Sequence, residues 1–402
     1  MLSSFCKYAP VFDSRCKRYS FYVIIVFALF CSLYITSRSY GPSSLMSIDR
    51  ETGARTEVED PNGGEYESPQ FAAVGMGNYS LWSPSVSETQ LQCVSFDDMM
   101  SDGQRYRFDI NGSDVLVFLH IQKTAGTTFE RYLVRQLNLP QPCQCWPKRK
   151  RCTCLRPSGS GHWLFSRFST GWNCGLHADW TELITSGCVD KFLNRREKRV
   201  TRRRYFISTM LREPVARFIS EFKHVQRGAT WQATPHFCNG RPPSSEEMPP
   251  CFNPEVGWEG VSLEEFLNCS SNFGFNRMTR MLSDLTTVGC YSRSLLDPNS
   301  RSALILESAK NNLRKMAFFG LQEDMRRSQY VFEELFSLRF NKPMVNQMEQ
   351  SDPAEFTVTQ LEHIRNANRL DIEIYNFARQ LFYKRFQLLK AKDSFYELNM
   401  AV

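Results

Sequence analysis

The chain repeatedly places a short apolar block ahead of a segment whose apolar residues recur at helical spacing. Asp114–His120 holds five consecutive apolar residues between polar ones, which is typical of a strand buried on both faces of a parallel sheet. Residues 127–139 follow with helical spacing. A second strand is predicted at 204–211, and the segment from Pro214 to Val225 predicts a helix whose first turn tolerates proline.

Two further elements extend this pattern. Residues 317–321 predict a third buried strand, and the apolar positions between Leu361 and Leu381 predict one long amphipathic helix. Strands that alternate with helices favour an α/β fold, in which a parallel central sheet is flanked by helices on both faces.

An uncharged apolar stretch, Phe21–Ile35, stands apart from these elements. With one residue added on each side it covers 20–36, roughly 25 Å of helix at ~1.5 Å per residue, near the lower limit for a membrane span. Basic residues cluster before it, so the positive-inside rule predicts a cytoplasmic tail at 1–19 and a luminal chain after residue 36. A cleaved signal peptide is the alternative, although no small-x-small cleavage site is obvious.

Composition divides the luminal part. Residues 37–108 are rich in Ser, Gly, Pro, Asp and Glu, which predicts a mostly disordered stem. A catalytic domain at 109–392 and a C-terminal tail at 393–402 complete the prediction. The net charge of +7 is too small to indicate a nucleic-acid partner, and we expect none, but it permits local basic patches that meet a polyanion.

Cysteines and glycosylation motifs agree with a luminal location. Three of the 14 cysteines (Cys6, Cys16 and Cys31) lie in or before the apolar stretch, and the remaining eleven face an oxidising lumen. Because eleven is odd, at least one thiol is free, bound to metal or paired between chains. The predicted glycosylation acceptors are Asn78, Asn111 and Asn268.

The loop between the first strand and its helix, Gln122–Thr128 (QKTAGTT), has the composition of an anion cradle. Backbone N–H groups of the turn and the helix N-terminus, threonine hydroxyls and a lysine all favour a negative ligand there. The G-x-x-x-x-G-K-[ST] spacing of a Walker A loop is absent. Taken alone, the segment can also be an ordinary helix-capping turn.

Four blocks of the chain carry a more specific resemblance: HIQKTAGTTF (120–129), LFSRFSTGWNCGLHADWTEL (164–183), LREPVARFISEFKHVQRGATW (211–231) and AFFGL (317–321). In this order, and over about 110–390, they resemble the heparan sulfate 6-O-sulfotransferases. The resemblance implies a single-pass type II Golgi membrane glycoprotein with a P-loop-like sulfotransferase fold that uses 3′-phosphoadenylyl sulfate (PAPS) and no metal.

Two departures from the family pattern accompany the resemblance. Ala125 replaces a usual glycine, which is tolerable if its φ is negative. The segment 343–353 diverges from the family's donor loop, so no contacts are carried over to it.

The resemblance implies a donor site in the first loop and the second strand–helix unit. Lys123 is expected to bind the phosphosulfate and stabilise the leaving oxygen, while Thr127 and Thr128 cradle the 5′-phosphate. Arg212 and Ser220 match the 3′-phosphate site, although Arg212 alone can be an ordinary surface ion pair. The complete predicted donor set is His120, Ile121, Gln122, Lys123, Thr124, Ala125, Gly126, Thr127, Thr128, Arg212 and Ser220.

Histidine is the natural general base near neutral pH. His177 lies in GLHADW, which matches the family's catalytic base, and His120 and His224 are the alternatives. Anionic groups of an acceptor tend to raise the pKa of His177, so activity is expected to fall as pH drops through about 6.5.

The acceptor implied by the resemblance is heparan sulfate, a polyanion that needs cations and flat aromatic surfaces. The matching positions are Lys150, Arg151, Arg167, Trp172, His177, His224 and Trp231. A second basic run, Arg195–Arg204, is predicted to be an exposed loop that adds non-specific attraction. Cys143, Cys145, Cys152 and Cys154 can be read as a zinc site or as two disulfides, and the lumen favours disulfides whose pairing stays open.

These residues favour a PAPS-dependent carbohydrate sulfotransferase that acts at the 6-O position of glucosamine in heparan sulfate. A related 2-O enzyme would share the fold and the donor loop. A silent heparin-binding module would lack a competent pair such as Lys123 and His177. A P-loop kinase is disfavoured by the missing Walker signature.

Overall fold

The structure is a computed structural model that describes residues 91–159, 161–229, 234–252, 257–345, 355–394 and 396. The predicted anchor at 20–36, most of the predicted stem, Asn78, Trp231 and residues 346–353 of the divergent segment lie outside the described residues. No helix in this part of the chain is long and apolar enough to cross a bilayer.

A parallel sheet forms the centre of the fold, and β6 (Arg204–Leu211) is its middle strand. On one side β6 pairs with β2 (Val115–Leu119), which in turn pairs with the short β5 (Leu164–Phe165). On the other side β1 (Gln92–Cys93) pairs with the first residues of β6 and β7 (Phe318–Leu321) with its last residues. All five residues of β2 are buried, as the apolar run predicts.

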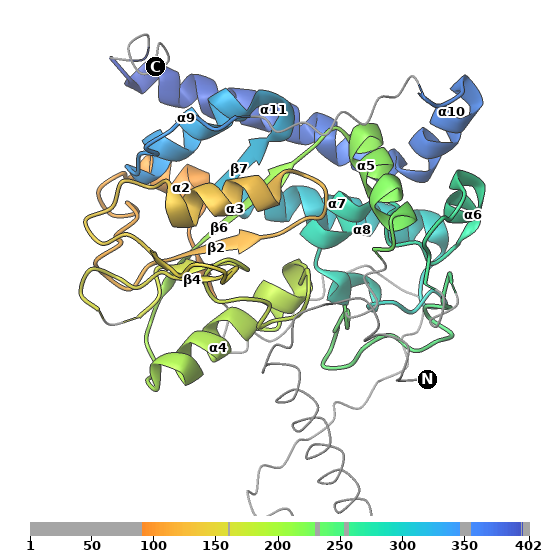
Figure 1. Cartoon of the computed structure of the whole chain (residues 1–402), viewed down its shortest axis with the longest axis horizontal. Helices are drawn as coiled ribbons and strands as arrows, with labels where there is room; N and C mark the ends of the chain where they lie inside the picture. The colour runs from red at the N-terminus through yellow and green to blue at the C-terminus, as the bar shows by residue number, and fades with distance from the viewer. Residues whose placement is uncertain are drawn as a thin grey trace, which may run out of the picture. The chain divides into compact units, whose positions relative to one another are not determined.

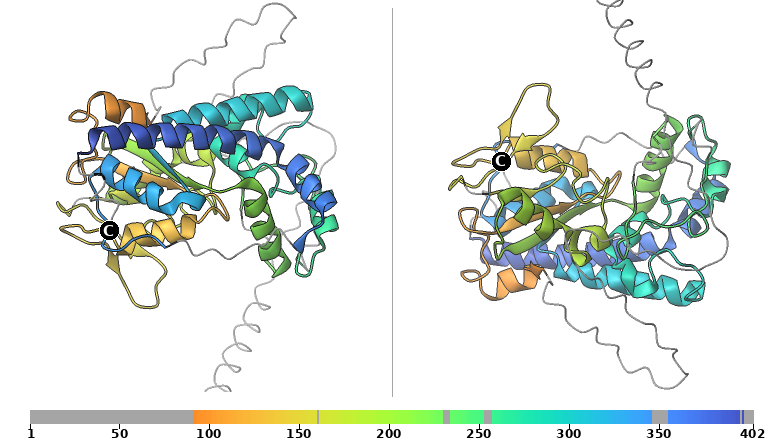
Figure 2. Two further views of the ribbon diagram at one scale, coloured as in Figure 1. Left: turned by 90° about the horizontal axis from the view of Figure 1, so that it is seen from above. Right: turned by 90° about the horizontal axis from the view of Figure 1, so that it is seen from below.

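Helices cover both faces of the sheet (Figures 1 and 2). Successive side chains of β7 point to opposite faces of the sheet and so identify the helices on each face. The ring of Phe318 packs against Phe129 and Phe332, whereas the ring of Phe319 packs against Phe382. The first face therefore carries α3 (Gly126–Arg135) and α9 (Met325–Phe336). The second carries α11 (Arg369–Lys392), which runs beside α8 (Pro298–Lys315). The predicted parallel α/β fold is confirmed.

The fold begins earlier than composition predicts. β1 lies within the predicted stem, and α2 (Phe96–Ser101) follows with a Ser95 capping box. Val94 and Phe96 are fully buried in the main core. The boundary at 109 was therefore too late, because a strand of two residues and a helix of six are too short to produce a clear period in the sequence.

The predicted long C-terminal helix is also wrong in one respect, since two helices occupy this segment. α10 (Val358–Ala367) ends where α11 begins, at Asn368. Asn368 is fully buried, its Nδ2 donates to the Ile364 carbonyl (2.8 Å), and its Oδ1 accepts from the Asn276 N–H (3.2 Å). These polar contacts fix a break that an apolar pattern does not reveal.

α5 (Pro214–Gln226) begins directly after β6 with proline in its first turn, as predicted. Its buried face carries an ion-pair network to α7 (Arg277–Leu282) and α11. Glu221 contacts both Arg217 and Arg277, with the Arg277 Nε donating over 2.9 Å, and Arg217 Nε lies 3.7 Å from Asp371 Oδ2. Burial alone would raise the pKa of Glu221, but Arg277 and Arg217 lower it to about 2.

We expect Glu221→Gln to lower the free energy of unfolding by about 3–5 kcal/mol, because it leaves two buried arginines short of one carboxylate. In the wild type, a folded-state pKa near 2 against an ordinary 4.5 means stability that is present above pH 4.5 and lost as pH falls toward 2. Urea unfolding across this pH range measures both effects. The exposed Glu264→Gln is the control, and equal stabilities of the two variants would contradict the prediction.

The remaining short elements carry disulfides and loops. The hairpin of β3 (Gln144–Cys145) and β4 (Cys152–Thr153) holds two disulfides, Cys143–Cys154 and Cys145–Cys152. These pairings confirm disulfides over a zinc site. Three further bridges are Cys174–Cys188, Cys238–Cys290 and Cys251–Cys269, and Cys93 is the cysteine without a disulfide among the described residues. The other elements are the π-helical η1 (Thr181–Thr185), α4 (Cys188–Glu197), α6 (Leu263–Asn268), η2 (Leu285–Val288) and η3 (Gln322–Asp324).

Candidate active site

The carboxyl ends of β2, β6 and β7 meet at one edge of the sheet, where α/β folds bind ligands. A cleft of about 430 Å³ opens there. Its lining consists of His120, Lys123, Ala125, Gly126, Thr127, Thr128, Arg131, Arg212, Ser220 and Gln322. The cleft therefore gathers most of the predicted donor-site residues from three segments of the chain.

Three predicted donor residues do not line the cleft. Ile121, Gln122 and Thr124 are buried, and the Thr124 hydroxyl donates to the Ile121 carbonyl (3.0 Å). The Thr124 side chain thus holds the shape of the loop from the inside.

Ala125 corrects one expectation. Its φ is 68°, in the left-handed region, and Lys123 has a similar φ of 65°. The condition under which alanine would be tolerated without strain, a negative φ, is therefore not met. Left-handed residues at positions 123 and 125 therefore flank a residue with a negative φ. Such alternation of backbone conformation turns successive N–H groups toward one side, which is the geometry of an anion-binding nest.

We expect Ala125→Gly to stabilise the domain by about 1 kcal/mol, because glycine adopts a left-handed backbone without the steric cost that alanine meets. Thermal unfolding measures the change. Gly126→Ala is the opposing control, since a Cβ there would lie 3.0 Å from His120 Nδ1 and should destabilise. A lower melting temperature for Ala125→Gly would contradict the argument.

Arg212 joins the second strand to the donor loop. It follows β6 directly, is buried, and its Nη1 donates to the Lys123 carbonyl (3.2 Å). Glu213 caps α5 by accepting from the N–H groups of Val215 and Ala216. Ser220, further along the same helix, lines the cleft.

Two cleft residues were missed by the sequence analysis. Arg131 lies one helical turn after Thr127, and Gln322 follows β7 just as Arg212 follows β6. Helical periodicity from the cradle would have found the first, and the rule that ligands sit at strand carboxyl ends would have found the second.

A third missed residue is Glu130, which lies fully buried behind the cleft. It contacts His120 Nδ1, and its Oε1 accepts from the Arg167 N–H (3.1 Å). Burial raises the pKa of Glu130 to about 8, and the Arg167 guanidinium opposes that rise. Arg167 Nη1 also lies 3.3 Å from His120 Nε2.

This network connects the two predicted parts of the site. Arg167 was expected at the acceptor, yet its Nη2 donates to the Thr127 hydroxyl (2.9 Å) on the donor loop. Its guanidinium also lies over the rings of Phe168 (4.6 Å) and Trp172 (5.4 Å). Glu130 thereby holds Arg167 between the donor cleft and Trp172.

We expect Glu130→Ala to lower kcat about 10–100-fold, the effect of losing buried hydrogen bonds that fix His120 and Arg167. Glu130→Gln keeps an acceptor for the Arg167 N–H and should restore part of the rate. Turnover measured with each substrate varied separately, together with urea unfolding, tests this. Full activity of a folded Glu130→Ala protein would contradict the positioning role.

The predicted base lies next to this network. The ring centroid of His177 is 5.2 Å from that of His120 and 4.5 Å from that of Trp172. His177 is buried and has a left-handed backbone with φ of 54°. Burial, then His120, Arg277 and Arg167 lower its pKa well below 6.5. The protein environment alone thus keeps His177 neutral at neutral pH, whereas the expected upward shift concerns the anionic groups of a bound acceptor.

The predicted acceptor residues surround His177 in part. The disulfide-bonded hairpin carries Lys150 and Arg151, and Arg151 Nη1 approaches the Thr170 carbonyl (3.5 Å) beside Trp172. His224 lies half-buried on α5. The structure therefore brings Arg151, Arg167, Trp172 and His177 to one side of the donor cleft.

The basic run Arg195–Arg204 is only partly the predicted exposed loop. Arg203 is buried and pairs with Glu197 (2.6 Å), and Arg204 begins β6 with an ion pair to Asp114 (2.6 Å). Both arginines therefore serve the fold, and Arg195 and Arg196 lie on α4 instead of in a loop.

The comparisons with known proteins agree with this geometry. A model of the sulfotransferase family matches residues 106–378. Heparan-sulfate 6-O-sulfotransferase 1 of Cricetulus griseus is 50% identical over 284 residues, which cover 70% of this chain and 70% of that protein. The human protein of the same name is also 50% identical over 284 residues, which cover 70% of this chain and 68% of that protein. Heparan-sulfate 6-O-sulfotransferase 2 of Danio rerio is 52% identical over 293 residues, which cover 71% of this chain and 62% of that protein.

The fold and the cleft at its sheet edge are thus those of a sulfotransferase enzyme. Within that class, the chain belongs to the heparan-sulfate 6-O-sulfotransferase family. The five disulfides in the described part of the chain fit the oxidising compartments of the secretory pathway.

Proposed function

We propose that the chain transfers a sulfuryl group from PAPS to the 6-hydroxyl of glucosamine residues in heparan sulfate. The observation that carries the proposal is the meeting of a cationic cleft, with Lys123 and Arg212, and a buried neutral histidine, His177, whose ring contacts that of cleft residue His120.

The cleft residues suit a nucleotide phosphosulfate. PAPS supplies an activated sulfuryl group on a 5′-phosphate together with a 3′-phosphate. Lys123, Thr127 and Thr128 are proposed to bind the 5′ end through the loop and its backbone N–H groups. Arg212 and Ser220 are proposed to bind the 3′-phosphate, since Arg212 can grip phosphate with two N–H groups. The left-handed residues of the loop support this fit.

His177 is proposed to accept the proton of the sugar hydroxyl. A general base must be unprotonated near the working pH, and the environment of His177 lowers its pKa. Lys123 is proposed to stabilise negative charge that develops on the leaving phosphate oxygen.

The acceptor is proposed to lie beside Trp172, where Lys150, Arg151 and Arg167 supply positive charge. His224 and Trp231 complete the proposed set. An aromatic face and several cations are what an anionic sugar chain requires.

The same proposal covers the setting of the enzyme. We infer a single-pass type II protein of the Golgi membrane with its anchor at 20–36 and its catalytic domain, ending near 392, in the lumen. The proposed partners are heparan sulfate and the membrane, with no nucleic acid.

Incubation of the purified luminal domain with labelled PAPS and heparan sulfate tests the proposal, followed by disaccharide analysis. Label on the 6-position of glucosamine is the expected result. Label on the 2-position of the uronic acid would overturn the proposed regiochemistry and favour the related 2-O activity. Absence of any transfer by folded protein would overturn the proposal as a whole.

A further inference from the structure

A second groove lies beside the candidate acceptor residues, with a volume of about 680 Å³. One wall of the groove is Asn173–Gly175. This segment lies between Trp172 and His177 in the sequence. The groove is therefore continuous along the chain with the segment that carries Trp172. Its full lining is Asn173, Cys174, Gly175, Thr181, Glu182, Thr185, Ser186, Cys188, Lys191, Phe192, Arg195, Phe237, Cys238, Asn239, Gly240 and Thr286.

Two cations mark the far wall. Lys191 and Arg195 are exposed, and they lie four residues apart on α4, so they share one face of that helix. Neither has an ion-pair partner among the residues that the structure describes. This distinguishes them from Arg203 and Arg204 nearby, which are paired with Glu197 and Asp114.

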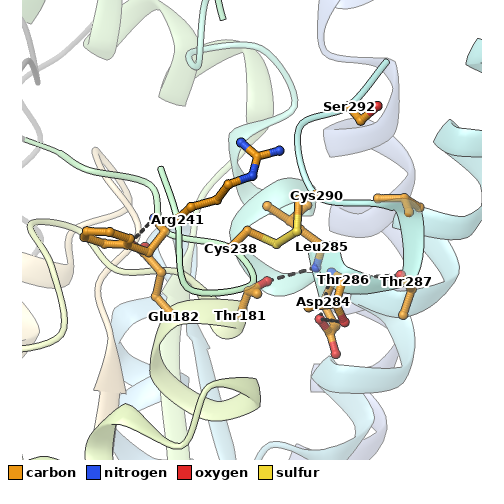
Figure 3. The surroundings of a disulfide bond; sticks show 12 residues. Thr181, Glu182, Cys238, Arg241, Asp284, Leu285, Thr286, Thr287, Cys290 and Ser292 are labelled. Carbon is orange, nitrogen blue, oxygen red and sulfur yellow. Dashed lines mark hydrogen bonds between the residues drawn. A yellow bond between two sulfur atoms is a disulfide. The ribbon is translucent and has the colours of Figure 1, made fainter. Parts of the chain in front are cut away.

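Disulfides hold both walls. Cys174–Cys188 ties the Trp172 side to the start of α4, and Cys238–Cys290 ties the opposite turn to the segment after η2 (Figure 3). That turn has Asn239 and Gly240 at positive φ, and Cys238 and Arg241 exchange backbone hydrogen bonds across it. Thr181 supports the base of the groove by accepting from the Leu285 N–H (2.9 Å). A groove braced in this way binds without the cost of ordering its loops.

The acidic residue in the groove does not oppose an anion strongly. Glu182 is buried, and its Oε1 accepts from the Phe237 N–H (2.9 Å) while its Oε2 accepts from the Asp179 N–H (3.1 Å). Burial, then Asp179, raises the pKa of Glu182 to about 8. The accessible charge of the groove is therefore positive.

We propose that this groove binds the sulfated stretch of the acceptor chain that flanks the reacting glucosamine, with Lys191 and Arg195 contacting its sulfate or carboxylate groups. The proposal rests on the proposed function, because that function supplies a polyanionic chain longer than the catalytic site. The groove then sets a preference for long, already sulfated acceptors and takes no part in the transfer itself.

The test compares the double variant Lys191→Ala/Arg195→Ala with the wild type, using a disaccharide and a dodecasaccharide acceptor. The KM for the dodecasaccharide should rise roughly 3- to 30-fold, the range expected for two exposed charge contacts. The kcat, the KM for PAPS and the KM for the disaccharide should stay within experimental error. The salt dependence of dodecasaccharide binding should weaken, with a slope lower by roughly 1.5–2 because two cations are removed.

Arg379→Ala/Lys384→Ala is the matched control, because it removes the same charge from exposed positions on α11, at the opposite side of the molecule from α4 (Figure 1). An equal KM increase in both double variants would mean that only net charge matters, and it would overturn the proposal that the groove binds the acceptor. An unchanged KM for the dodecasaccharide in Lys191→Ala/Arg195→Ala would overturn it as well. If the wild type sulfates neither acceptor, the proposed function fails, which is a different result from failure of the groove.

Discussion

Lys123→Ala is expected to remove most sulfuryl transfer while the domain stays folded. Lys123 lines the donor cleft at a left-handed position of the loop, and its carbonyl accepts a hydrogen bond from Arg212. The substitution keeps that carbonyl and removes only the ammonium group. A contact to charge that develops in the transition state contributes about 3–4 kcal/mol, so the rate should fall about 10²–10³-fold. Single-turnover transfer with labelled PAPS measures this, with unfolding curves to establish the fold.

Lys198→Ala provides a matched control for this variant. Lys198 also has a left-handed backbone, with φ of 54°, but it is exposed at the end of α4 and does not line the donor cleft. Any general effect of alanine at a left-handed lysine appears in both variants. Near-normal turnover by a folded Lys123→Ala protein would rule out the proposed role, whatever the control shows.

The sheet was the most predictable part of the fold. The five apolar residues of β2 and the β-branched and aromatic residues of β6 are short blocks between polar residues, which favours strands buried on both faces. β1 and β5 escaped prediction, since each has only two residues and depends on its neighbour for its backbone hydrogen bonds. The break at Asn368 escaped for a related reason, because it depends on a hydrogen bond to Asn276, 92 residues away.

The residues of the candidate site also differ in how far the sequence alone predicts them. Residues in the first loop were predictable because a lysine, threonines and glycine between a strand and a helix form a local pattern. Glu130 was not, since a glutamate inside a helix usually faces solvent, and only the fold places it against His120 and Arg167. The lowered pKa that the protein itself gives His177 could not be predicted from the sequence either. It depends on burial and on His120, Arg277 and Arg167, which come from distant segments.

His177→Ala is expected to lower kcat about 10²–10⁴-fold, the range that a positioned general base contributes. PAPS binding should stay almost unchanged, because Lys123 and Arg212 in the cleft are proposed to hold the donor. The base works only when unprotonated, and its pKa in the structure is well below 6.5. The acid limb of kcat/KM in the wild type should therefore lie below pH 6.5, and folded His177→Ala should lack it.

His236→Ala separates this role from the general effect of removing a buried histidine. His236 resembles His177 in burial, in its φ of 53° and in a lowered pKa, but its ring packs on Phe273 at 4.0 Å and does not contact His120. Its removal should cost stability and leave the acid limb in place. His224→Ala tests the remaining alternative. If folded His177→Ala kept wild-type turnover and the acid limb while His224→Ala lost both, the proton acceptor would be His224, and the lowered pKa of His177 would reflect packing alone.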